Sequence, residues 1–485
     1  MKVLFINPPA FNDLTVAIGK EVTENSSSQP PLGLLYIATF LCKHSSNEVK
    51  VIDAQVDRLS YHQLEIEVSQ WKPDIVGITA MTSTMVDVML TAHLIKRVNH
   101  EIVICLGGPH VDIYPNETIR LNGVDFAIKG AGEEPFFILV KELSSERQFD
   151  RVPALVYQDK NHEIHINPSS SASPDLEDLP FPDRNMVPFQ KYYSIMTTNR
   201  PVGTMITAKG CPYSCIFCSE GGRQPLWRTG ESVAAEMEYC KNIGIREMFF
   251  VDDTFYVKKQ PAMAIAQALI DRQVGMPWGA RARVNNLDRE ILEKFKESGC
   301  RRLHIGVEAG TDRVLRSLRK NITVNQARQS FKFCHEVKID TMAYFIIGSP
   351  GETLKDVQAT LKLARELEPT MAQFSRMTPM PATDLYDMGL RTGILPYDYW
   401  KEFAQDPLAS VAKGFRPMVW TENFSEDELL SLVDHHTRGF YFRPKYIFRT
   451  AVQIRSIHDV MRKLRAAHDL FKGTSPSKTK LQKLI

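Results

Sequence analysis

Apolar and polar positions divide the first 145 residues into short β-branched runs separated by longer stretches of helical character. A strand followed by a helix, repeated along the chain, predicts a parallel sheet with helices on both faces. Two of the expected helices cover residues 34–43 and 87–98. The expected strands cover residues 2–6, 49–53, 75–79, 102–106 and 125–128.

Small and turn-forming residues follow these strands. Thr79 ends the third strand, Ser83 lies just beyond it, and Gly107 and Gly108 follow the fourth strand. Ligands of open parallel sheets bind at the carboxyl ends of the strands, and glycine lets a ligand approach the backbone closely. These residues are therefore candidates for a ligand-binding edge, and the alternative is that the glycines only turn the chain.

Residues 146–200 have the composition of a linker. A short predicted hairpin, with strands at 154–157 and 164–166, precedes a run rich in Ser and Pro. Such clusters interrupt periodic structure. We expect this stretch to connect two folded units.

The alternation of strands and helices returns between residues 201 and 385. Six such units predict a partial (β/α) barrel with its active groups at the carboxyl ends of the strands. The expected strands cover residues 204–208, 247–251, 278–281, 302–307, 341–347 and 372–375.

The last hundred residues have mainly helical and loop character, and the chain from Gly473 onward resembles a frayed basic tail. Apolar residues at helical spacing predict a packed helix. They are Ile447, Ala451, Ile454, Met461 and Leu464.

Three cysteines, Cys211, Cys215 and Cys218, follow the first strand of the second half in a CxxxCxxC turn. Three thiolates hold three irons of a four-iron, four-sulfur cluster, whose full ligation needs four ligands. A zinc site would usually bring a fourth Cys or His at close spacing, and none is visible near this turn. The turn therefore predicts a 4Fe-4S cluster with one iron open to a small molecule.

The five other cysteines are scattered, mostly in apolar contexts, and we expect them to be buried small hydrophobic residues. They are Cys42, Cys105, Cys240, Cys300 and Cys334.

Composition and charge restrict the class of protein. With 485 residues, 43% of them hydrophobic and 24% charged, the chain is typical of a globular protein of two to four domains. No apolar run reaches the ~18 residues that a membrane span needs, and the apolar start is too short for a signal peptide. We therefore expect a cytoplasmic protein without a nucleic-acid partner, and the net charge of +2 by itself says little about partners.

The charge is distributed unevenly near the end of the chain. From Arg438 onward there are many Lys and Arg and only two acidic residues, Asp459 and Asp469. An exposed basic helix usually has a solvated face, and the alternative is a surface for anionic lipid or an acidic substrate.

The cysteine turn resembles the cluster loop of the radical S-adenosylmethionine (SAM) superfamily, whose open iron binds SAM. Four pieces of the first half, in front of such a core, resemble the class with a cobalamin-binding domain. They are Lys2-Val-Leu-Phe-Ile-Asn-Pro-Pro, Pro30-Pro-Leu-Gly-Leu-Leu-Tyr-Ile-Ala, Gly107-Gly-Pro-His and Gly130-Ala-Gly-Glu-Glu-Pro. The resemblance covers residues 1 to about 385 and implies three cofactors: a 4Fe-4S cluster, SAM and cobalamin.

The resemblance implies a fold of three parts. They are a Rossmann-like cobalamin-binding domain (1–145), a radical SAM core (201–385) and a mainly helical C-terminal domain (386–485), with 146–200 as a linker. By position, Thr79, Ser83, Gly107 and Gly108 would face the nucleotide tail of cobalamin. Many cobalamin domains donate a lower axial His from an Asp-x-His-x-x-Gly run after the first strand, where Asn7-Pro8-Pro9 stands here. A histidine-free lower face is common in this radical class, and the lower ligand of cobalt is undefined.

Two further statements concern the cobalamin side. The loop 82–85 is the expected neighbour of the lower face of cobalt. His110 is expected to be a surface or core histidine and not a ligand.

The resemblance also implies a set of SAM-binding residues. Phe217 would pack the adenine, Asp252 or Asp253 would contact the amine, and Arg283 would pair with the carboxylate. Glu308 would accept from hydroxyl or amine groups of SAM, and Gly348 would contact the adenine through its backbone. No side chain is implied as a catalytic acid or base.

The activity implied most directly is methylation of an unactivated carbon of a lipid, tetrapyrrole or secondary metabolite, through a 5′-deoxyadenosyl radical and methylcobalamin. The turn, with Trp227-Arg228 and Asp252-Asp253-Thr254-Phe255, also resembles the branch that contains the anaerobic oxidative cyclase of bacteriochlorophyll synthesis and hopanoid-tailoring proteins. Radical cyclisation is therefore an alternative, and a corrinoid carrier or sensor without chemistry is another. A methylthiotransferase usually has three more cysteines in its first domain, where only Cys42 and Cys105 stand.

The implied partners are a small-molecule or lipid-like substrate and an electron donor such as flavodoxin or ferredoxin. Peripheral membrane contact through the basic C-terminal helix is a further expectation.

Overall fold

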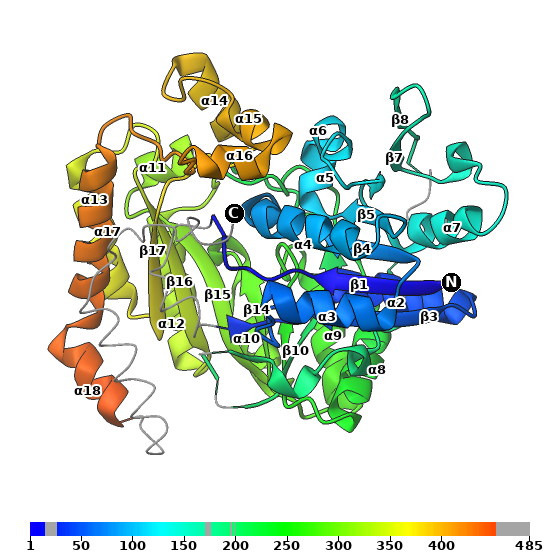
Figure 1. Ribbon diagram of the computed structural model, residues 1–485. Helices are drawn as coiled ribbons and strands as arrows, with labels where there is room; N and C mark the ends of the chain where they lie inside the picture. Colours follow the sequence, from blue (N-terminus) through cyan, green and yellow to red (C-terminus); the bar gives the residue numbers. More distant parts are fainter. Residues whose placement is uncertain (15–26, 170–175, 195, 198, 453–485) are drawn as a thin grey trace.

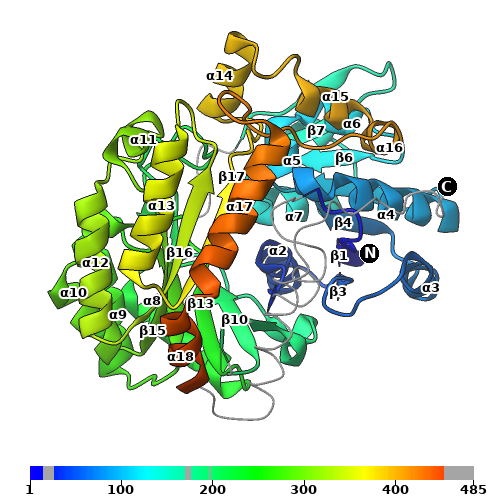
Figure 2. The same cartoon turned by 90° about the vertical axis from the view of Figure 1, so that its left-hand side faces the viewer.

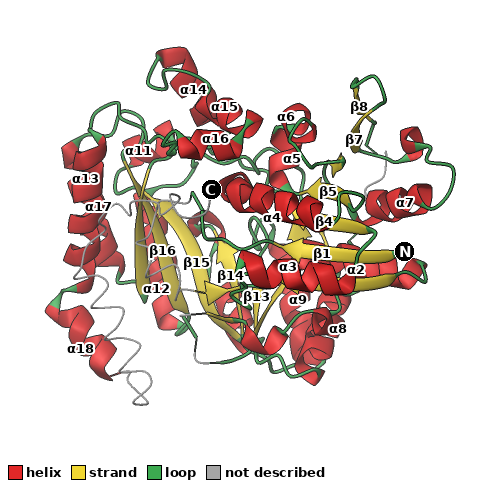
Figure 3. Cartoon of the chain, in the orientation of Figure 1, coloured by secondary structure: helices red, strands yellow, loops and turns green. Residues whose placement is uncertain are grey.

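The computed structural model describes residues 1–14, 27–169, 176–194, 196–197 and 199–452. Two sheets lie at the centre of the molecule and helices surround them (Figure 1 and Figure 3). The α/β fold class expected from the strand and helix pattern is confirmed, because both sheets are built mainly from parallel strands joined by helices.

The first sheet has seven strands in the order β3-β1-β4-β5-β6-β7-β8. Its strands are β1 (Lys2–Asn7), β3 (Glu48–Asp53), β4 (Ile75–Thr79), β5 (Val103–Gly107), β6 (Phe126–Ile128), β7 (Leu155–Gln158) and β8 (Ile164–Ile166). Its helices are α2 (Leu32–His44), α3 (Tyr61–Trp71), α4 (Met85–Val98), α5 (Pro109–Ile113), α6 (Pro115–Ile119) and α7 (Glu133–Leu143). All five strands expected here form, with shifts of one residue at some ends.

The hairpin expected within the linker extends this first sheet. β7 pairs antiparallel with β6, and β8 pairs antiparallel with β7. The sheet thus continues past residue 145.

The second sheet has six parallel strands in the order β10-β13-β14-β15-β16-β17 and forms the expected partial barrel. Its strands are β10 (Val202–Met205), β13 (Glu247–Phe250), β14 (Trp278–Ala282), β15 (Cys300–Glu308), β16 (Asp340–Ile347) and β17 (Met371–Arg376). Its helices are α8 (Gly230–Asn242), α9 (Lys259–Asp271), α10 (Arg289–Glu297), α11 (Asp312–Ser317), α12 (Val324–Glu336) and α13 (Leu354–Leu367).

One strand expected at residues 204–208 is divided in two. β10 ends at Met205, and a separate β11 (Ala208–Lys209) pairs antiparallel with β12 (Leu226–Trp227). The physical reason is Asp252, whose carboxylate accepts hydrogen bonds from the backbone N–H groups of Thr207 and Ala208. These bonds take the chain out of the barrel sheet just before the cysteine turn.

The stretch between the two sheets is packed where the structure describes it. Buried Arg184 and Arg228 both pair with the buried carboxylate of Glu236 on α8. Tyr192 donates a hydrogen bond of 2.7 Å to Asp53 at the end of β3. Residues 183–192 therefore contact both halves, while the domain boundaries stay a prediction. A short pair of strands, β2 (Ser27–Ser28) and β9 (Tyr193–Ser194), also joins the halves.

The C-terminal helices are α14 (Asp384–Thr392), α15 (Tyr399–Gln405), α16 (Pro407–Ala412), α17 (Glu426–Tyr441) and α18 (Pro444–Val452). α15 and α16 pack on α6 and α4 of the first unit, whose core includes Tyr399, Trp400 and Phe403. α17 runs beside β17 and α13 at the other end of the molecule (Figure 2). The expected helical C-terminal region is confirmed through residue 452.

Part of that helical pattern lies outside the described residues: Ile454, Met461, Leu464 and the tail from Gly473. Within α18, Ile447 is 52% exposed, so the expectation of a packed helix is wrong at that position. No helix in the described part of the chain is long and apolar enough to cross a membrane.

Four of the five scattered cysteines are buried, as expected: Cys105, Cys240, Cys300 and Cys334. The expectation is wrong for Cys42, which is exposed. The buried positions of α2 include Leu34, Leu35, Ala38 and Leu41, and Cys42 lies on another face of the helix.

Candidate functional site

The cysteine turn is a loop closed at its neck. β11 and β12 pair on either side of it, and the N–H of Arg223 donates to the carbonyl of Cys211 across it. Ile216 in the middle of the loop donates to the carbonyl of Leu318 and accepts from the N–H of Leu385. The loop is therefore held on both sides in the folded chain, and its cysteines are presented at the carboxyl end of the barrel.

The three thiols share one local environment. Cys211 and Cys215 are buried and Cys218 is exposed. Partial burial raises the pKa of Cys218, and the negative charges of Cys215 and Cys211 raise it further. The thiols therefore lie close enough to act on one another electrostatically.

The spacing of the thiols also bears on the kind of metal. Within the described ranges, the one compact group of possible ligands is Asp159, Glu163 and His165 on the β7–β8 hairpin. The three cysteines are not such a group, and a single zinc ion needs four ligands around it at about 2.0–2.3 Å. Three thiols on a wider triangle fit an iron–sulfur cluster better than a single ion.

Arg283 follows β14 and lies beneath the loop. Its Nη1 is 3.4 Å from the sulfur of Cys215, and its guanidinium stacks 3.7 Å from the centre of the Tyr213 ring. Its Nη2 donates to the carbonyl of Lys320, while its buried Nε has no hydrogen-bond partner among the described residues. Arg283 places a positive charge beside a cluster thiolate, where it would stabilise negative charge.

Asp252 and Asp253, which follow β13, have different surroundings. Asp252 is buried and accepts from Thr207 and Ala208, and burial raises its pKa to about 6. Asp253 is exposed and accepts one backbone bond of 3.2 Å, from Gly210. The carboxylate with free capacity for a ligand is that of Asp253, whereas Asp252 shapes the start of the cysteine turn.

Glu308, at the end of β15, forms a buried ion pair with Lys320. The side chains of the two residues are only 7% and 8% exposed. The ammonium of Lys320 also lies 5.9 Å from the centre of the Phe217 ring. The pair thus joins the barrel strand to the cysteine turn.

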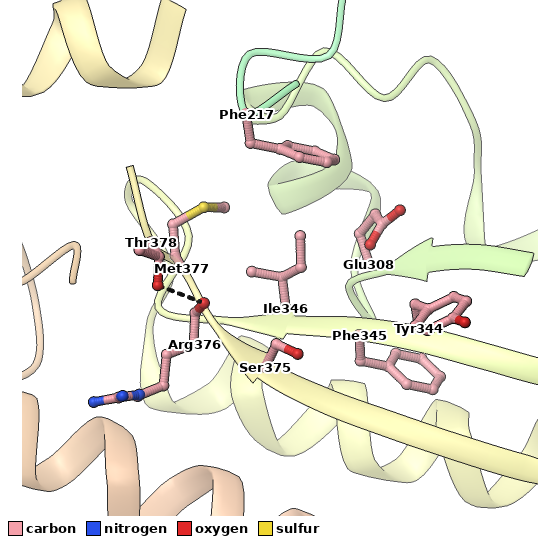
Figure 4. Close-up of a pocket in the computed structure, with 9 residues that line it drawn as sticks. All are labelled: Phe217, Glu308, Tyr344, Phe345, Ile346, Ser375, Arg376, Met377 and Thr378. Carbon is pink, nitrogen blue, oxygen red and sulfur yellow. Dashed lines mark hydrogen bonds between the residues drawn. The ribbon is translucent and has the colours of Figure 1, made fainter. Parts of the chain in front are cut away.

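A cavity of about 260 Å³ lies between Phe217, Glu308 and the ends of β16 and β17. Figure 4 shows Phe217 on one side of it, Glu308 on another and Ile346 between them. We call it the strand-end cavity, and its lining is Phe217, Glu308, Tyr344, Phe345, Ile346, Ser375, Arg376, Met377 and Thr378.

Gly348 follows β16, and the N–H groups of Gly348 and Ser349 both donate to the carboxylate of Glu352. The second oxygen of Glu352 is buried without a partner among the described residues. Burial raises the pKa of this carboxyl to about 7. Leu429 of α17 packs on Gly348, 2.6 Å from where a Cβ would stand, so α17 covers this strand end.

The four residues expected at the first sheet lie together at the ends of β4 and β5. Thr79 and Gly107 are paired in register, and Ser83 lies in the short helix that follows β4. Gly108 has φ of +109°, and a Cβ there would meet the carbonyl oxygen of Ala80 at 2.9 Å. The two strand ends therefore approach each other closely, with backbone at the surface in place of side chains.

His110 is a core histidine, as expected. It is completely buried, and burial lowers its pKa to about 3. Its Nδ1 lies 3.1 Å from the hydroxyl of Thr82. It thus supports the loop that follows β4 from behind.

The two strand-end regions face a common space. The charges of Arg223 and Glu220 on the cysteine turn act on Asp112 of α5, whose pKa is raised chiefly by burial. Leu32 and Tyr36 of α2 share an apolar cluster with Ile206 and Val251 at the ends of β10 and β13. The structure thus brings the β4–β5 edge near the cysteine turn.

Two contacts of this site had no signal in the sequence. Lys320 lies twelve positions after Glu308 with no motif between them, and Tyr213 stands in the turn as an ordinary aromatic residue. A buried charge needs a partner, so the burial of Glu308 requires a cation beside it, and the sequence does not show which one.

The residues present fit the three cofactors. The three thiols have no fourth Cys or His close to their turn in the sequence, Arg283 has a buried N–H without a partner among the described residues, and Gly107 and Gly108 place no side chain at the strand ends. These are the features that an open-iron cluster, an anionic group and a bulky ligand would use.

Comparisons with known proteins agree with this geometry. Residues 205–364 match the radical SAM superfamily, and residues 22–140 match the B12 binding domain. An uncharacterized methyltransferase of Pyrococcus horikoshii is 30% identical over 457 residues, which cover 93% of this chain and 94% of that protein.

Two further relatives are informative. The anaerobic magnesium-protoporphyrin IX monomethyl ester cyclase of Rubrivivax gelatinosus is 28% identical over 459 residues, 92% of this chain and 78% of the cyclase. The solved radical SAM methyltransferase TsrM of Kitasatospora setae, with cobalamin and a [4Fe-4S] cluster bound, has the same fold. Its TM-score is 0.73 at 17% identity, over 98% of this chain and 100% of TsrM.

The expected cofactors, a 4Fe-4S cluster, SAM and cobalamin, are thus supported by both halves of the chain, and the chain belongs to the radical SAM enzymes that carry a B12-binding domain.

Proposed function

We propose that the protein is a cobalamin-dependent radical SAM methyltransferase that methylates an unactivated carbon of its substrate. The observation that carries the proposal is the trio of thiols in a CxxxCxxC turn, with no fourth Cys or His close by in the sequence, near the strand edge at Gly107 and Gly108 of a B12-binding sheet. The methyltransferase from Pyrococcus horikoshii, which aligns over nearly the whole chain, supports it.

The residues of the chain have distinct parts in this proposal. Cys211, Cys215 and Cys218 hold the cluster and leave one iron open. When bound, the cluster and SAM supply a radical that removes hydrogen, and cobalamin supplies the methyl group. The protein binds and orients these groups and keeps water away from them.

The SAM site is proposed to lie between the cysteine turn and the strand ends of the barrel. Asp253 is proposed to bind the SAM amine, because its carboxylate is more open than that of Asp252. Arg283 offers an unpaired N–H for the carboxylate of SAM. Phe217 and Gly348 border the adenine, and Glu308, held by Lys320, accepts from the ribose or amine.

The cobalamin site is proposed at the ends of β4 and β5. Thr79 and Ser83 offer hydroxyl groups there, and Gly107 and Gly108 let the nucleotide tail approach the backbone. His110 is buried behind Thr82, so it is not proposed as a ligand of cobalt.

Radical cyclisation or oxidation is the second candidate, because the Rubrivivax cyclase aligns over 92% of this chain. It would use the same cluster and SAM residues. With either outcome we propose three further features. They are a lipid-like or tetrapyrrole substrate, an electron donor of the flavodoxin or ferredoxin type, and membrane contact through the basic segment beyond Arg438. Most of that basic segment lies outside the described residues.

The experiment is anaerobic reconstitution with iron, sulfide and cobalamin, followed by reaction with SAM and extract of cells that lack the protein. Methylation predicts 5′-deoxyadenosine, S-adenosylhomocysteine and a product heavier by one methyl group. Cyclisation predicts 5′-deoxyadenosine without S-adenosylhomocysteine. A carrier or sensor would form no 5′-deoxyadenosine, and that result would overturn both candidates.

A further inference from the structure

The concave face of the barrel sheet carries polar side chains that the cofactors do not require. Arg281 of β14 is paired in register with His304 of β15, and Tyr344 of β16 is paired with Gly306. Because residues in register on parallel strands point to the same face, Arg281, His304 and Tyr344 share that face. Gly306 contributes no side chain, and the charged ends of Glu308 and Lys320 occupy the space that a Cβ would take there.

A chain of hydrogen bonds runs along this face. Buried Glu247 of β13 pairs with Arg302 at 3.0 Å, and the Nε of Arg302 donates to the Nε2 of His304 at 3.2 Å. The Nδ1 of His304 lies 2.7 Å from the hydroxyl of Tyr344. At the far end, Thr197 and Asn199 donate to Glu247, which fixes the start of the chain.

This chain determines how the Tyr344 hydroxyl is oriented. Arginine keeps its charge and can only donate, so the Nε2 of His304 must accept. Burial and the nearby charges of Arg302 and Arg281 lower the pKa of His304 to about 3, so the ring is neutral and carries its proton on Nδ1. That Nδ1–H donates to the oxygen of Tyr344, and the Tyr344 proton stays available.

The Tyr344 proton has no acceptor among the described residues, since His304 is the one hydrogen-bond partner of its hydroxyl there. Tyr344 also lines the strand-end cavity, beside Glu308 (Figure 4). The ring of Tyr344 borders the cavity and its hydroxyl is turned away from Phe217 and Ile346 (Figure 4). It therefore offers a donor beside the cavity, and His304 sets the direction of that donor.

Arg281 adds a positive charge next to this donor, and the nearby carboxylate of Asp253 compensates it in part. Its side chain is exposed, its Nη1 donates to the carbonyl of Val251 at 3.1 Å, and it forms no ion pair within the described residues. Its charge acts on Tyr344, on His304 and on Asp253. The other charges of this face are paired, Arg302 with Glu247 and Lys320 with Glu308.

We propose that Arg281 and Tyr344 bind an anionic oxygen group of the substrate, a carboxylate or a phosphate, inside the barrel. His304 is a positioning residue that directs the Tyr344 proton. This inference rests on the proposed function and names its substrate class. A guanidinium and a hydroxyl that both donate match an acceptor-only group, and such charge-assisted bonds are the stronger ones.

The test uses reconstituted holoenzyme, SAM, a chemical reductant for the cluster, and a small-molecule extract of cells that lack the protein. The extract is first divided on a strong anion exchanger. The readout is disappearance of an extract component, so that methylation and cyclisation are detected alike. We expect the consumed component to be in the retained, anionic fraction. Phosphatase treatment of that fraction removes a phosphate group and leaves a carboxylate, and so distinguishes the two. Consumption from the unretained fraction alone would overturn the proposal, whatever the product.

Variants test the residues separately. Arg281→Gln and Tyr344→Phe are each expected to raise the half-saturating amount of the anionic fraction about ten-fold, the loss expected of one charge-assisted bond, and Arg281→Lys is expected to lie between Gln and wild type. Tyr239→Phe is the matched control. Tyr239 lies on helix α8, outside the barrel sheet, and its hydroxyl donates to Asp183. A change in the half-saturating concentration of SAM, and not of the extract, would assign Arg281 to the cofactor and overturn the proposal.

The positioning role of His304 has its own comparison. Glutamine can accept from Arg302 and donate to Tyr344, as the neutral imidazole does, whereas leucine can do neither. We expect His304→Gln to stay near wild type and His304→Leu to behave like Tyr344→Phe, with equal cluster content in both. Equal effects of the two substitutions would mean that His304 only fills space.

Discussion

The edge of the first sheet and the edge of the barrel sheet are both carboxyl ends of parallel strands, yet they are built differently. At β4 and β5 the surface is backbone and small side chains, represented by Thr79, Gly107 and Gly108. At the barrel it is thiols and charges, represented by Cys215 and the Glu308–Lys320 pair.

The difference follows from what each edge has to hold. In the proposed function the first edge holds the bulky nucleotide tail of cobalamin, which shape and backbone contacts would bind and an added side chain would obstruct. A cluster and a charged sulfonium compound need thiolates and oriented charges, and each buried charge then needs a partner. The first edge is therefore sensitive to added volume and the second to removed charge.

The sharpest test of the second edge is loss of a thiolate. Cys215→Ser removes one of three iron ligands and the contact with Arg283, so we expect loss of the cluster absorbance and of all turnover. Iron and sulfide analysis and the 5′-deoxyadenosine assay measure this. Cys42→Ser, at an exposed thiol on α2, is the control and should behave as wild type. Full activity of the Cys215 variant would refute the assignment of the turn.

The next effect concerns the buried pair. Glu308→Gln leaves Lys320 buried without its counter-charge, and we expect a loss of about 3–5 kcal/mol of stability. The shift of the urea midpoint measures it. The double variant Glu308→Gln/Lys320→Met should recover much of the loss. Arg328→Gln, which breaks the exposed pair with Glu366, should cost about 1 kcal/mol or less. Equal losses in the exposed and buried variants would contradict the account.

At the first edge the expected effect is smaller and steric. Gly108→Ala places a Cβ 2.9 Å from the carbonyl of Ala80 in a backbone conformation that L side chains rarely adopt, at a cost of about 1–3 kcal/mol. Reduced cobalamin content with an unchanged cluster is the expected readout. In Gly107→Ala the added Cβ would lie 3.9 Å from the carbonyl oxygen of Ile128, an ordinary contact, so the stability of this variant should stay close to wild type. A larger loss of stability and of bound cobalamin in Gly107→Ala than in Gly108→Ala would contradict this account.

The smallest expected effect is a pH dependence at the barrel edge. Burial raises the pKa of Glu352 to about 7 from 4.5, so the folded chain holds a proton that the unfolded chain has released. The associated stability is complete below pH 4.5 and is lost as the pH rises through 7. Urea unfolding of Glu352→Gln across this range should show a shallower decline than wild type. If the free energies of unfolding of wild type and variant declined in parallel with pH, the raised pKa of Glu352 would be contradicted.

Much of the fold was predictable because its signals are local. Residues 75–79 form a strand in the sequence pattern and in the structure, since branched apolar residues between turn signals favour that conformation wherever the strand packs. The same holds for the helical pattern of α4. The strand expected at 204–208 failed because Asp252, distant in sequence, accepts the bonds that the ladder would have used.

The candidate site was predictable in part for the same reason. The spacing of Cys211, Cys215 and Cys218 is a local feature, and so is the succession Gly107-Gly108 after a strand. Other features of the site depend on contacts between elements far apart in the chain. They are the different surroundings of Asp252 and Asp253, the ion pair of Glu308 with Lys320, and the stacking of Arg283 on Tyr213.

The sequence by itself determined the class of this protein: a parallel α/β chain with an incomplete set of iron ligands after a barrel strand. The tertiary structure alone decided that α15 and α16 complete the core of the first unit, and that Arg281 and Tyr344 share the concave face of the barrel. The physical reason is that periodicity and short spacings act between neighbours, whereas burial, charge pairing and hydrogen-bond direction depend on which strands and helices meet.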